Sequence, residues 1–335
     1  MLTALKDLGE ILLQKQSKAP IDILLENPDS NGTYKIVWAL DFDKNLNFEK
    51  ISVEELKEEI PYIYLYKRAS GSNAPDFSPT SRITEPEKTF TKKLLKWLEN
   101  HNNVPEIKII YDNLNKNKDK IISKLEELNQ QSKDNKILTI KINHQYLYNI
   151  QNPDFKKILL NDYLEKIKEI SQKDAICSIC GNKKEVFTTS QIYKFYTLDK
   201  ECYISGGFNK NKAWKNFPIC EECFLKIDYA KKYVEDHLKY NFHGKIYYLI
   251  PKMILNIPEA LNEINDILTL EEKKQKLTKE QRKTLTGNIE EILDILKDKK
   301  DIISLYFLFL KKDNAAERIL LLIEDVLPTR IHFRF

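Results

Sequence analysis

Two short stretches, CSICGNKKEVF at residues 177–187 and FPICEECFLKI at residues 217–227, each hold a pair of cysteines two residues apart. A CxxC turn points two thiolates toward one centre, and two such turns supply the four ligands of a structural Zn²⁺ ion. Gly181 follows the first pair and Pro218 precedes the second, and both residue types favour tight turns. We therefore predict a structural zinc site with the ligands Cys177, Cys180, Cys220 and Cys223.

Two other uses of these cysteines stay open, a redox site and a site that has lost its metal. A catalytic zinc is disfavoured, because four thiolates leave no coordination position for a substrate. The 39 residues between the pairs are more than a minimal zinc ribbon needs, but the cost of closing a loop grows slowly with its length. The fifth cysteine, Cys202, is expected to be a small buried residue, with a role as a substitute ligand as the alternative.

Composition places the chain among globular proteins of a reducing compartment. It has 335 residues, of which 42% are hydrophobic and 31% charged, and its odd number of five cysteines fits metal binding better than a disulfide framework. No apolar run approaches the roughly 20 residues of a membrane span, and the N-terminus lacks the features of a secretion signal. We expect a cytoplasmic protein without membrane contact. Only 8 glycines are present, which disfavours the glycine-rich loops of nucleotide-driven enzymes.

The apolar patterns predict an α+β fold with three lobes. These are a mixed α/β N-terminal lobe (1–150) with a long loop at 67–85, an inserted four-cysteine zinc-binding lobe (151–256), and a helical hairpin with a closing β-hairpin (257–335). Helices are expected at residues 1–16, 52–60, 84–98, 116–131 and 153–170, with a helical hairpin after Pro258. Strands are expected at residues 33–42, 62–66, 107–111, 137–142, 245–250, 302–310 and 318–323.

An excess of positive charge coincides with the cysteine segment, where residues 176–256 hold 13 basic and 8 acidic residues. Between the two cysteine pairs, lysines alternate with an aromatic residue, a pattern that can follow a phosphate backbone and stack on a base. The candidates are Lys210, Lys212, Trp214 and Lys215. Two other interpretations stay open: a loop whose Trp214 packs under the zinc turns, and a basic face that only keeps the protein soluble.

Catalytic patterns are missing from the sequence. The five histidines lie apart, and the one acidic stretch, with Asp76 and Glu87, falls on a proline-rich loop and a helix start. A two-metal nuclease needs its carboxylates to converge from paired elements. We therefore predict that the protein is not an enzyme and keep a metal-dependent nuclease as the rejected alternative.

Several stretches together resemble the large subunit of type I-B CRISPR surveillance complexes, the Csh-type family of zinc-binding Cascade large subunits. The resemblance covers nearly the whole chain in order and spacing. It rests on the stretches at 63–80 (IYLYKRASGSNAPDFSPT), 177–187, 195–200 (FYTLDK), 213–242, 246–252 (IYYLIPK) and 320–330 (LLLIEDVLPTR).

The resemblance implies a non-catalytic subunit at the 5′ handle end of the guide RNA. Such a subunit recognises the flanking motif (PAM) of a target in double-stranded DNA and helps to open the duplex. The implied partners are the guide RNA, the target DNA, the Cascade backbone subunits, the small subunit and a recruited helicase-nuclease, with the four cysteines as zinc ligands. Family members continue into a long helical C-terminal region, and we expect that region to be missing here.

The loop from Lys67 to Arg82 matches a characteristic stretch of the family, so we expect it to reach guide RNA or flanking DNA. Arginine and amide side chains read base edges, whereas lysines hold phosphates. Arg68, Asn73 and Arg82 are therefore candidates for base contacts, and Lys67 joins Lys210, Lys212 and Lys215 as candidates for backbone contacts. Docking of this loop on a neighbouring subunit is the alternative, as is a zinc-stabilised scaffold that holds proteins together without reading DNA.

Overall fold

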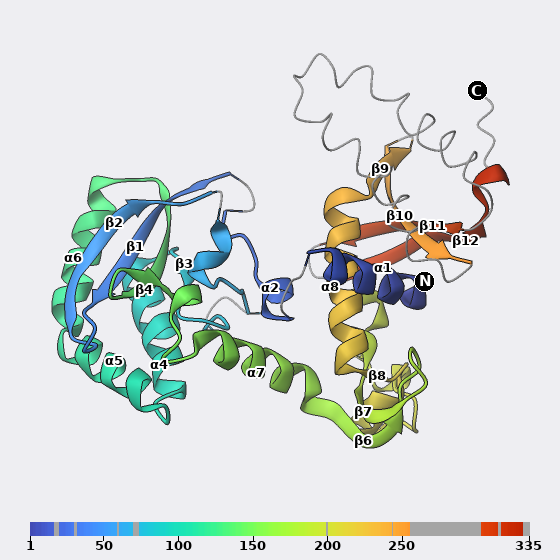
Figure 1. Ribbon diagram of the computed structural model, residues 1–335, viewed down its shortest axis with the longest axis horizontal. Helices are drawn as coiled ribbons and strands as arrows, with labels where there is room; N and C mark the ends of the chain where they lie inside the picture. Colours follow the sequence, from blue (N-terminus) through green and yellow to red (C-terminus); the bar gives the residue numbers. More distant parts are fainter. Residues whose placement is uncertain are drawn as a thin grey trace, which may run out of the picture. The chain divides into compact units, whose positions relative to one another are not determined.

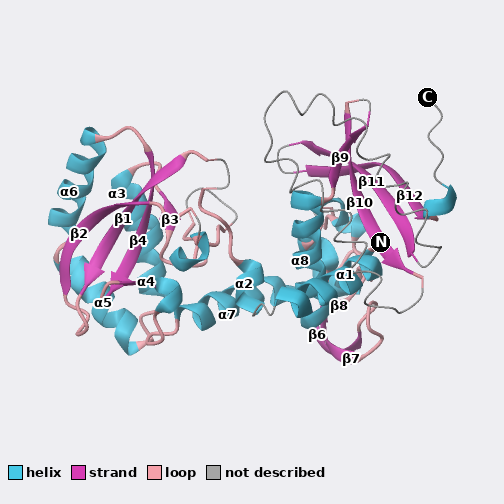
Figure 2. Ribbon diagram, turned by 45° about the horizontal axis from the view of Figure 1, so that its top comes forward, coloured by secondary structure: helices cyan, strands magenta, loops and turns pink. Residues whose placement is uncertain are grey.

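The structure is a computed structural model that describes residues 1–16, 20–29, 32–58, 60–69, 74–198, 200–242, 244–254, 303–313 and 316–330. These residues form two compact units (Figure 1). We refer to Pro20–Lys166 as the continuous unit, and to Met1–Ala19 together with Ile167–Phe335 as the split unit. Both units combine helices with β-sheet (Figure 2), which confirms the predicted α+β class. The three predicted lobe ranges stay a prediction.

The continuous unit is built on one mixed sheet with the strand order β2-β1-β4-β3, and β5 pairs with β4. Strands β1 and β4 are parallel, and the other pairs are antiparallel. The strands are β1 (Tyr34–Phe42), β2 (Phe48–Glu55), β3 (Ser81–Arg82), β4 (Asn135–Ile142) and β5 (Gln145–Tyr146). The helices are α2 (Pro20–Leu24), the 3₁₀ helices η1 (Pro61–Tyr64) and η3 (Leu147–Asn149), α3 (Pro86–Lys88), the π-helical η2 (Thr89–Leu95), α4 (Lys96–Asn100), α5 (Pro105–Lys116), α6 (Lys118–Gln131) and α7 (Phe155–Ile167).

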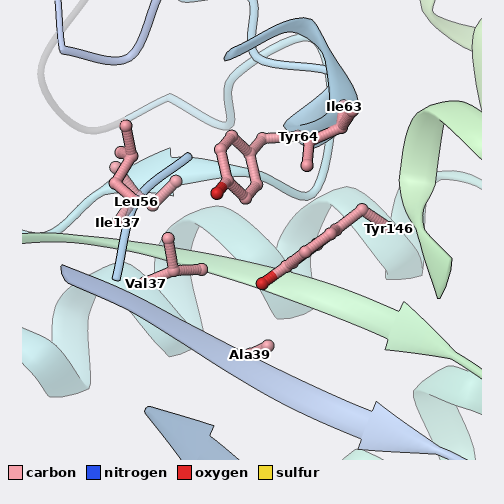
Figure 3. Close-up of a cluster of buried hydrophobic side chains, with 7 residues drawn as sticks. All are labelled: Val37, Ala39, Leu56, Ile63, Tyr64, Ile137 and Tyr146. Carbon is pink, nitrogen blue, oxygen red and sulfur yellow. The ribbon is translucent and has the colours of Figure 1, made fainter. Parts of the chain in front are cut away.

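Both faces of strand β1 are buried. Successive side chains of a strand point to opposite faces, so Trp38 and Leu40 lie on one face of the sheet, while Val37 and Ala39 lie on the other. The face with Val37 carries a compact apolar cluster (Figure 3). Within it the rings of Tyr64 and Tyr146 meet edge to face, with centroids 4.8 Å apart. The other members of the cluster are Leu56, Ile63 and Ile137.

Two predicted elements near the start of this unit are wrong. Ser52 and Glu55 do not cap a helix, because residues 48–55 form β2 and pair with β1, with Ser52 opposite Ala39. Residues 62–66 do not form a strand. Pro61 instead stands in the first turn of η1, and the chain leaves η1 through Leu65 at φ +53°.

The predicted strand at 107–111 is also wrong, because these residues lie inside α5. Pro105 occupies the first turn of α5, where its missing N–H costs nothing. The buried residues Ile107, Ile110 and Leu114 follow the i, i+3, i+7 spacing of a helix. The predictions for the strands at 33–42 and 137–142, and for the helices at 84–98, 116–131 and 153–170, are confirmed as to type.

The described residues of the split unit form two antiparallel sheets. One has the order β12-β11-β10-β9, and a smaller one has the order β6-β7-β8. The strands are β6 (Ser171–Ile176), β7 (Lys183–Phe187), β8 (Ile219–Cys220), β9 (Lys239–Phe242), β10 (Lys245–Met253), β11 (Ile303–Asp313) and β12 (Ala316–Val326). The main helices are α1 (Leu2–Gln16) and α8 (Glu221–His237), with the 3₁₀ helices η6 (Lys194–Tyr196) and η8 (Lys210–Lys215) between β7 and β8. The predicted strands at 245–250, 302–310 and 318–323 are confirmed as parts of β10, β11 and β12, and the predicted helical hairpin lies outside the described residues.

Helix α1 joins this unit across a large separation in sequence. It packs on α8 and on β10, and its predicted apolar face is buried as Leu2, Leu5, Leu8, Ile11 and Leu12. Across the described ranges, every helix falls short of the length and apolar character that a bilayer-spanning helix needs.

Candidate metal centre and nucleic-acid contacts

The four cysteines of the two CxxC pairs converge in the split unit. The Sγ atoms of Cys177, Cys180, Cys220 and Cys223 all lie within 4.8 Å of one another, and Sγ of Cys180 is 3.9 Å from Sγ of Cys220. Four sulfurs about 2.3 Å from a tetrahedral zinc ion would lie about 3.8 Å apart, so the observed spacing fits such an ion. Cys177, Cys220 and Cys223 are buried, and Cys180 is half-buried.

Each pair is placed by a turn that the sequence specifies. The first pair lies in the turn between β6 and β7, where the N–H of Gly181 donates to the carbonyl of Cys177 at 2.9 Å. Gly181 has a φ of +71°, a conformation that favours glycine. The second pair bridges β8 and α8, with Cys220 ending the strand and Cys223 in the first helical turn.

Backbone amides and ion pairs bring the two turns together. The N–H groups of Ile179 and Cys220 both donate to Sγ of Cys177 at 3.4 Å. Lys184 on β7 pairs with Glu222 at 2.6 Å, next to the second pair of cysteines. Amide donors and a helix N-terminus both stabilise thiolates, so the scaffold supports negative sulfur ligands.

The thiols strongly perturb one another. Hydrogen bonds from the side chain and backbone of Cys223 lower the pKa of Cys220 to about 5, in spite of its burial. The pKa of Cys223 is raised, first by its hydrogen bond with Cys220 and then by burial and the neighbouring sulfurs. Burial also raises the pKa of Cys180. Four thiolates at this spacing need a cation to neutralise them, and Zn²⁺ meets that need.

Cys202 differs from its prediction. It is exposed, not buried, and it lies outside the cluster of four sulfurs. All five cysteines are free thiols in the structure.

Lys67 contacts other residues of the continuous unit. It is buried, its Nζ pairs with Oε1 of Glu26 at 2.6 Å, and it lies 5.1 Å from the ring centroid of Tyr163. These contacts hold the start of the loop, and contact of Lys67 with a nucleic acid stays a prediction.

Arg82 also contacts residues of the continuous unit. Its Nε donates to the carbonyl of Pro28 at 2.8 Å. Its guanidinium lies over the rings of Tyr34 and Tyr66, at 4.7 and 5.5 Å from their centroids. In contrast, Arg68 is exposed, and Asn73 lies outside the described residues.

Asp76 anchors the same loop. Its carboxylate is buried and accepts hydrogen bonds from Oγ of Ser81 at 2.6 Å, from the N–H of Ala69 at 3.1 Å and from Nζ of Lys93 at 3.1 Å. Within the described ranges, the four cysteines are the cluster of His, Cys, Asp and Glu side chains that is close enough to hold a metal ion. Asp76 therefore ties this loop together through its contacts with Ala69, Ser81 and Lys93.

The lysines between the cysteine pairs lie on the surface of the split unit. Lys210, Lys212 and Lys215 are exposed on η8, and Nζ of Lys210 lies 3.8 Å from Glu201. Trp214 is half-buried, with Nζ of Lys215 at 5.6 Å from its ring centroid. All four candidate residues thus lie on η8, a short distance before Cys220 in the sequence.

The split unit also has a groove that is not predictable from the sequence, because its walls come from distant parts of the chain. One wall includes Lys194, Phe195 and Tyr203, and the other includes Arg318 of β12. Arg318 lies more than a hundred residues after the others, and no local pattern connects such positions.

Two family models match the chain. The N-terminal domain of CRISPR-associated protein TM1802 (cas_TM1802) matches residues 1–161, and the central domain of the same protein matches residues 174–326. No curated protein matches the chain in a sequence search. The two domains together cover nearly all of the sequence, and the four cysteines lie inside the central domain. The chain therefore belongs to the TM1802 family of CRISPR-associated proteins.

Proposed function

We propose that this protein is the non-catalytic large subunit of a type I-B CRISPR RNA-guided surveillance complex. In this role it recognises the PAM in double-stranded DNA and helps the guide RNA to open the duplex. One observation carries the proposal: both TM1802 domains match in order along the chain, and the central one encloses a four-cysteine centre with three buried ligands and one half-buried ligand.

The proposed Zn²⁺ ion is structural. Four thiolates fill a tetrahedral coordination shell and leave no position for a substrate or water. In the proposal the ion joins the β6–β7 turn to the start of α8, which fixes the segment between them on the surface. DNA cleavage belongs to a recruited helicase-nuclease, and the other partners are the guide RNA, the backbone subunits and the small subunit in the cytoplasm.

Exposed cations are the best candidates for nucleic-acid contact. Arg68 is available for base edges in the PAM, and Lys210, Lys212 and Lys215 are available for phosphates. Side chains that are already bound inside the protein have to break those contacts before they can bind another molecule.

The internal contacts of Lys67 and Arg82 are an observation in favour of a second candidate function. Both are bound within the continuous unit, by Glu26 and by the Pro28 carbonyl respectively, so their loop has a structural role that needs no DNA. The second candidate is a zinc-stabilised scaffold that holds protein subunits of the same complex together.

Reconstitution with guide RNA and backbone subunits separates the two candidates. Binding is measured to double-stranded targets that differ only in the flanking bases. The large-subunit proposal expects tight binding to a few flanking sequences and a loss of this preference in Arg68→Ala and Asn73→Ala. Arg330→Ala, which removes an exposed arginine at a distant place in the sequence, is the control.

The lysines are tested in the same assay by salt dependence. A phosphate contact contributes about 0.9 to the slope of log K against log salt for duplex DNA, so Lys210→Ala and Lys212→Ala should each lower the slope by about that amount at every flanking sequence. Equal binding of the complex to all flanking sequences, with the complex intact, would favour the scaffold and contradict PAM recognition.

A further inference from the structure

A groove of about 890 Å³ lies between η6 and the start of β12 in the split unit. Lys194, Phe195 and Tyr203 contribute one wall, and Arg318 contributes the other. A second hollow of about 510 Å³ shares Phe195 and Tyr203 with the first and continues to Phe217. The two hollows therefore adjoin at Phe195 and Tyr203, and we name them together the aromatic groove.

The aromatic side chains of the groove keep part of their surface free. Tyr203 is 50% exposed and Phe217 is 44% exposed. Phe195 is half-buried. Its ring stacks on Tyr193 and is tilted against Tyr196, with both ring centroids 4.7 Å away. The groove thus offers ring surfaces to a ligand without unpacking the protein.

Hydrogen bonds hold the walls in place. The N–H of Lys194 donates to Oε2 of Glu317 at 2.8 Å, which ties η6 to β12. On the other side, the Asn216 amide donates to the carbonyl of Tyr203 at 2.6 Å and accepts from the N–H of Ser205 at 2.7 Å. A ligand would find these rings already positioned, which lowers the entropic cost of binding.

The charge around the groove is positive. Lys194, Lys200 and Arg318 are exposed, and no described carboxylate pairs with their side chains. The acidic residue of the lining, Glu317, has a side chain only 9% exposed and lies 3.7 Å from both Lys231 and Lys312. Its charge is therefore already neutralised, and three cations face solvent at the rim.

We propose that the aromatic groove binds a short run of unpaired nucleotides. The bases stack on Phe195, Tyr203 and Phe217. The phosphates lie beside Lys194, Lys200 and Arg318. Exposed rings combined with a cationic track are the features with which proteins bind single-stranded nucleic acid, whereas the base faces of a duplex are already stacked and cannot reach the rings. The inference rests on the proposed function in one respect, that the partner is a nucleic acid. The site that it assigns is remote in sequence from the 67–82 loop.

The full chain is tested alone, without guide RNA or other subunits. Fluorescence anisotropy measures its binding to labelled single strands of DNA and of RNA, about 12 nucleotides long, and to a duplex of the same sequence. We expect a clear preference for single strands, and comparison of the DNA and RNA strands identifies which of the two the groove takes.

Variants connect this binding to the groove. Tyr203→Ala should weaken single-strand binding about tenfold, and Tyr203→Phe should retain it because a phenyl ring also stacks. Tyr62→Ala, which removes a similarly exposed tyrosine from the continuous unit, is the matched control and should have no effect. Lys194→Ala and Lys200→Ala should each lower the salt slope by about 0.7, the contribution of one phosphate of a single strand.

The inference is overturned by an absence of single-strand binding, by equal affinity for the duplex, or by binding that Tyr203→Ala leaves unchanged. Polyglutamate that binds as tightly as the oligonucleotide would assign the groove to an acidic protein partner and also overturn the inference. Because the assay contains no guide RNA and no PAM, its result is independent of PAM recognition, so a failure of PAM recognition and a failure of the groove to bind single strands are distinguished.

Discussion

His101 carries an ion pair that only the protonated side chain can complete. Its Nε2 lies 2.9 Å from a carboxylate oxygen of Asp162, and its Nδ1 lies 2.8 Å from the carbonyl of Trp97. Both partners are acceptors, so both ring nitrogens must carry a proton. Burial disfavours the cation, but these hydrogen bonds outweigh burial and raise the pKa of His101 above its ordinary value of 6.5.

This arrangement predicts a pH-dependent contribution to stability. A pKa that is raised by folding stabilises the protein fully below about pH 6.5, and this contribution disappears as the pH rises through the folded pKa. Between about pH 5.5 and pH 8.5, the unfolding free energy of the native protein should therefore fall relative to that of His101→Asn. Urea unfolding at the two pH values measures the difference. His144→Asn, at an exposed histidine, should follow the native protein, and equal pH dependence in all three proteins would contradict the prediction.

Cys202, which lies outside the cluster of four sulfurs, provides a control for the metal centre. Cys223→Ser removes one of the four converging thiols and should abolish stoichiometric zinc binding, with a loss of at least about 3 kcal/mol of unfolding free energy. Cys202→Ser removes an exposed thiol outside the cluster and should change stability by less than about 0.5 kcal/mol. Elemental analysis and thermal unfolding measure the two effects. A native protein without bound zinc would show that the proposed metal is wrong.

Residue-level prediction from the sequence succeeded where a local pattern sufficed. The CxxC spacing alone located four sulfurs that meet in the structure, because each turn is local and closes on its own. The same reasoning could not tell that Lys67 binds Glu26, 41 residues before it, inside the protein. Whether a cation is free for a partner depends on such distant contacts.

At the scale of elements, the packing of α1 on α8 depends on a glycine. A Cβ atom added to Gly9 would lie 2.0 Å from the carbonyl oxygen of Lys226 on α8, so a larger residue forces the two helix backbones apart. Lys226 also pairs with Glu10 of α1 at 2.8 Å. The glycine thus permits close approach of the helices, although it lowers the intrinsic stability of α1.

Gly9→Ala should therefore destabilise the split unit. In an isolated helix this substitution is stabilising by about 1 kcal/mol, but overpacking at the contact should instead cost about 1 to 3 kcal/mol. The control is Thr3→Ala, at an exposed position of the same helix, which should be neutral or slightly stabilising. Chemical denaturation measures both variants, and a more stable Gly9→Ala protein would show that α1 does not approach α8 so closely.

The elements that sequence reasoning placed wrongly share a cause. Short apolar runs such as residues 107–111 fit both a strand and a buried face of a helix, and only the longer spacing that includes Leu114 distinguishes them. The serine and glutamate in 52–55 carry a helix-capping pattern, yet pairing with β1 decides their conformation. Long periodic segments such as α1 and α6 were predictable because their pattern is repeated over several turns.

At the scale of the whole molecule, the two units should respond differently to metal removal. The four sulfurs lie entirely in the split unit, so a chelator that strips zinc should lower the unfolding temperature of that unit. The continuous unit has its own sheet and apolar core and should unfold as before. We expect one chelator-sensitive and one chelator-insensitive transition in calorimetry of the full chain. A segment spanning residues 20–166 is the control, and its transition should not change with the chelator.

The split unit cannot complete its fold early in synthesis, because its two segments are far apart in the sequence. Helix α1 leaves the ribosome before its partner α8, which begins only at Glu221. At 5 to 20 residues per second this separation corresponds to a delay of about 10 to 40 seconds. During this interval the continuous unit can finish folding, while the leucine-rich side of the nascent helix has no place to dock. Apolar surface that stays uncovered during synthesis is prone to aggregation, which is the hazard that chaperones counter.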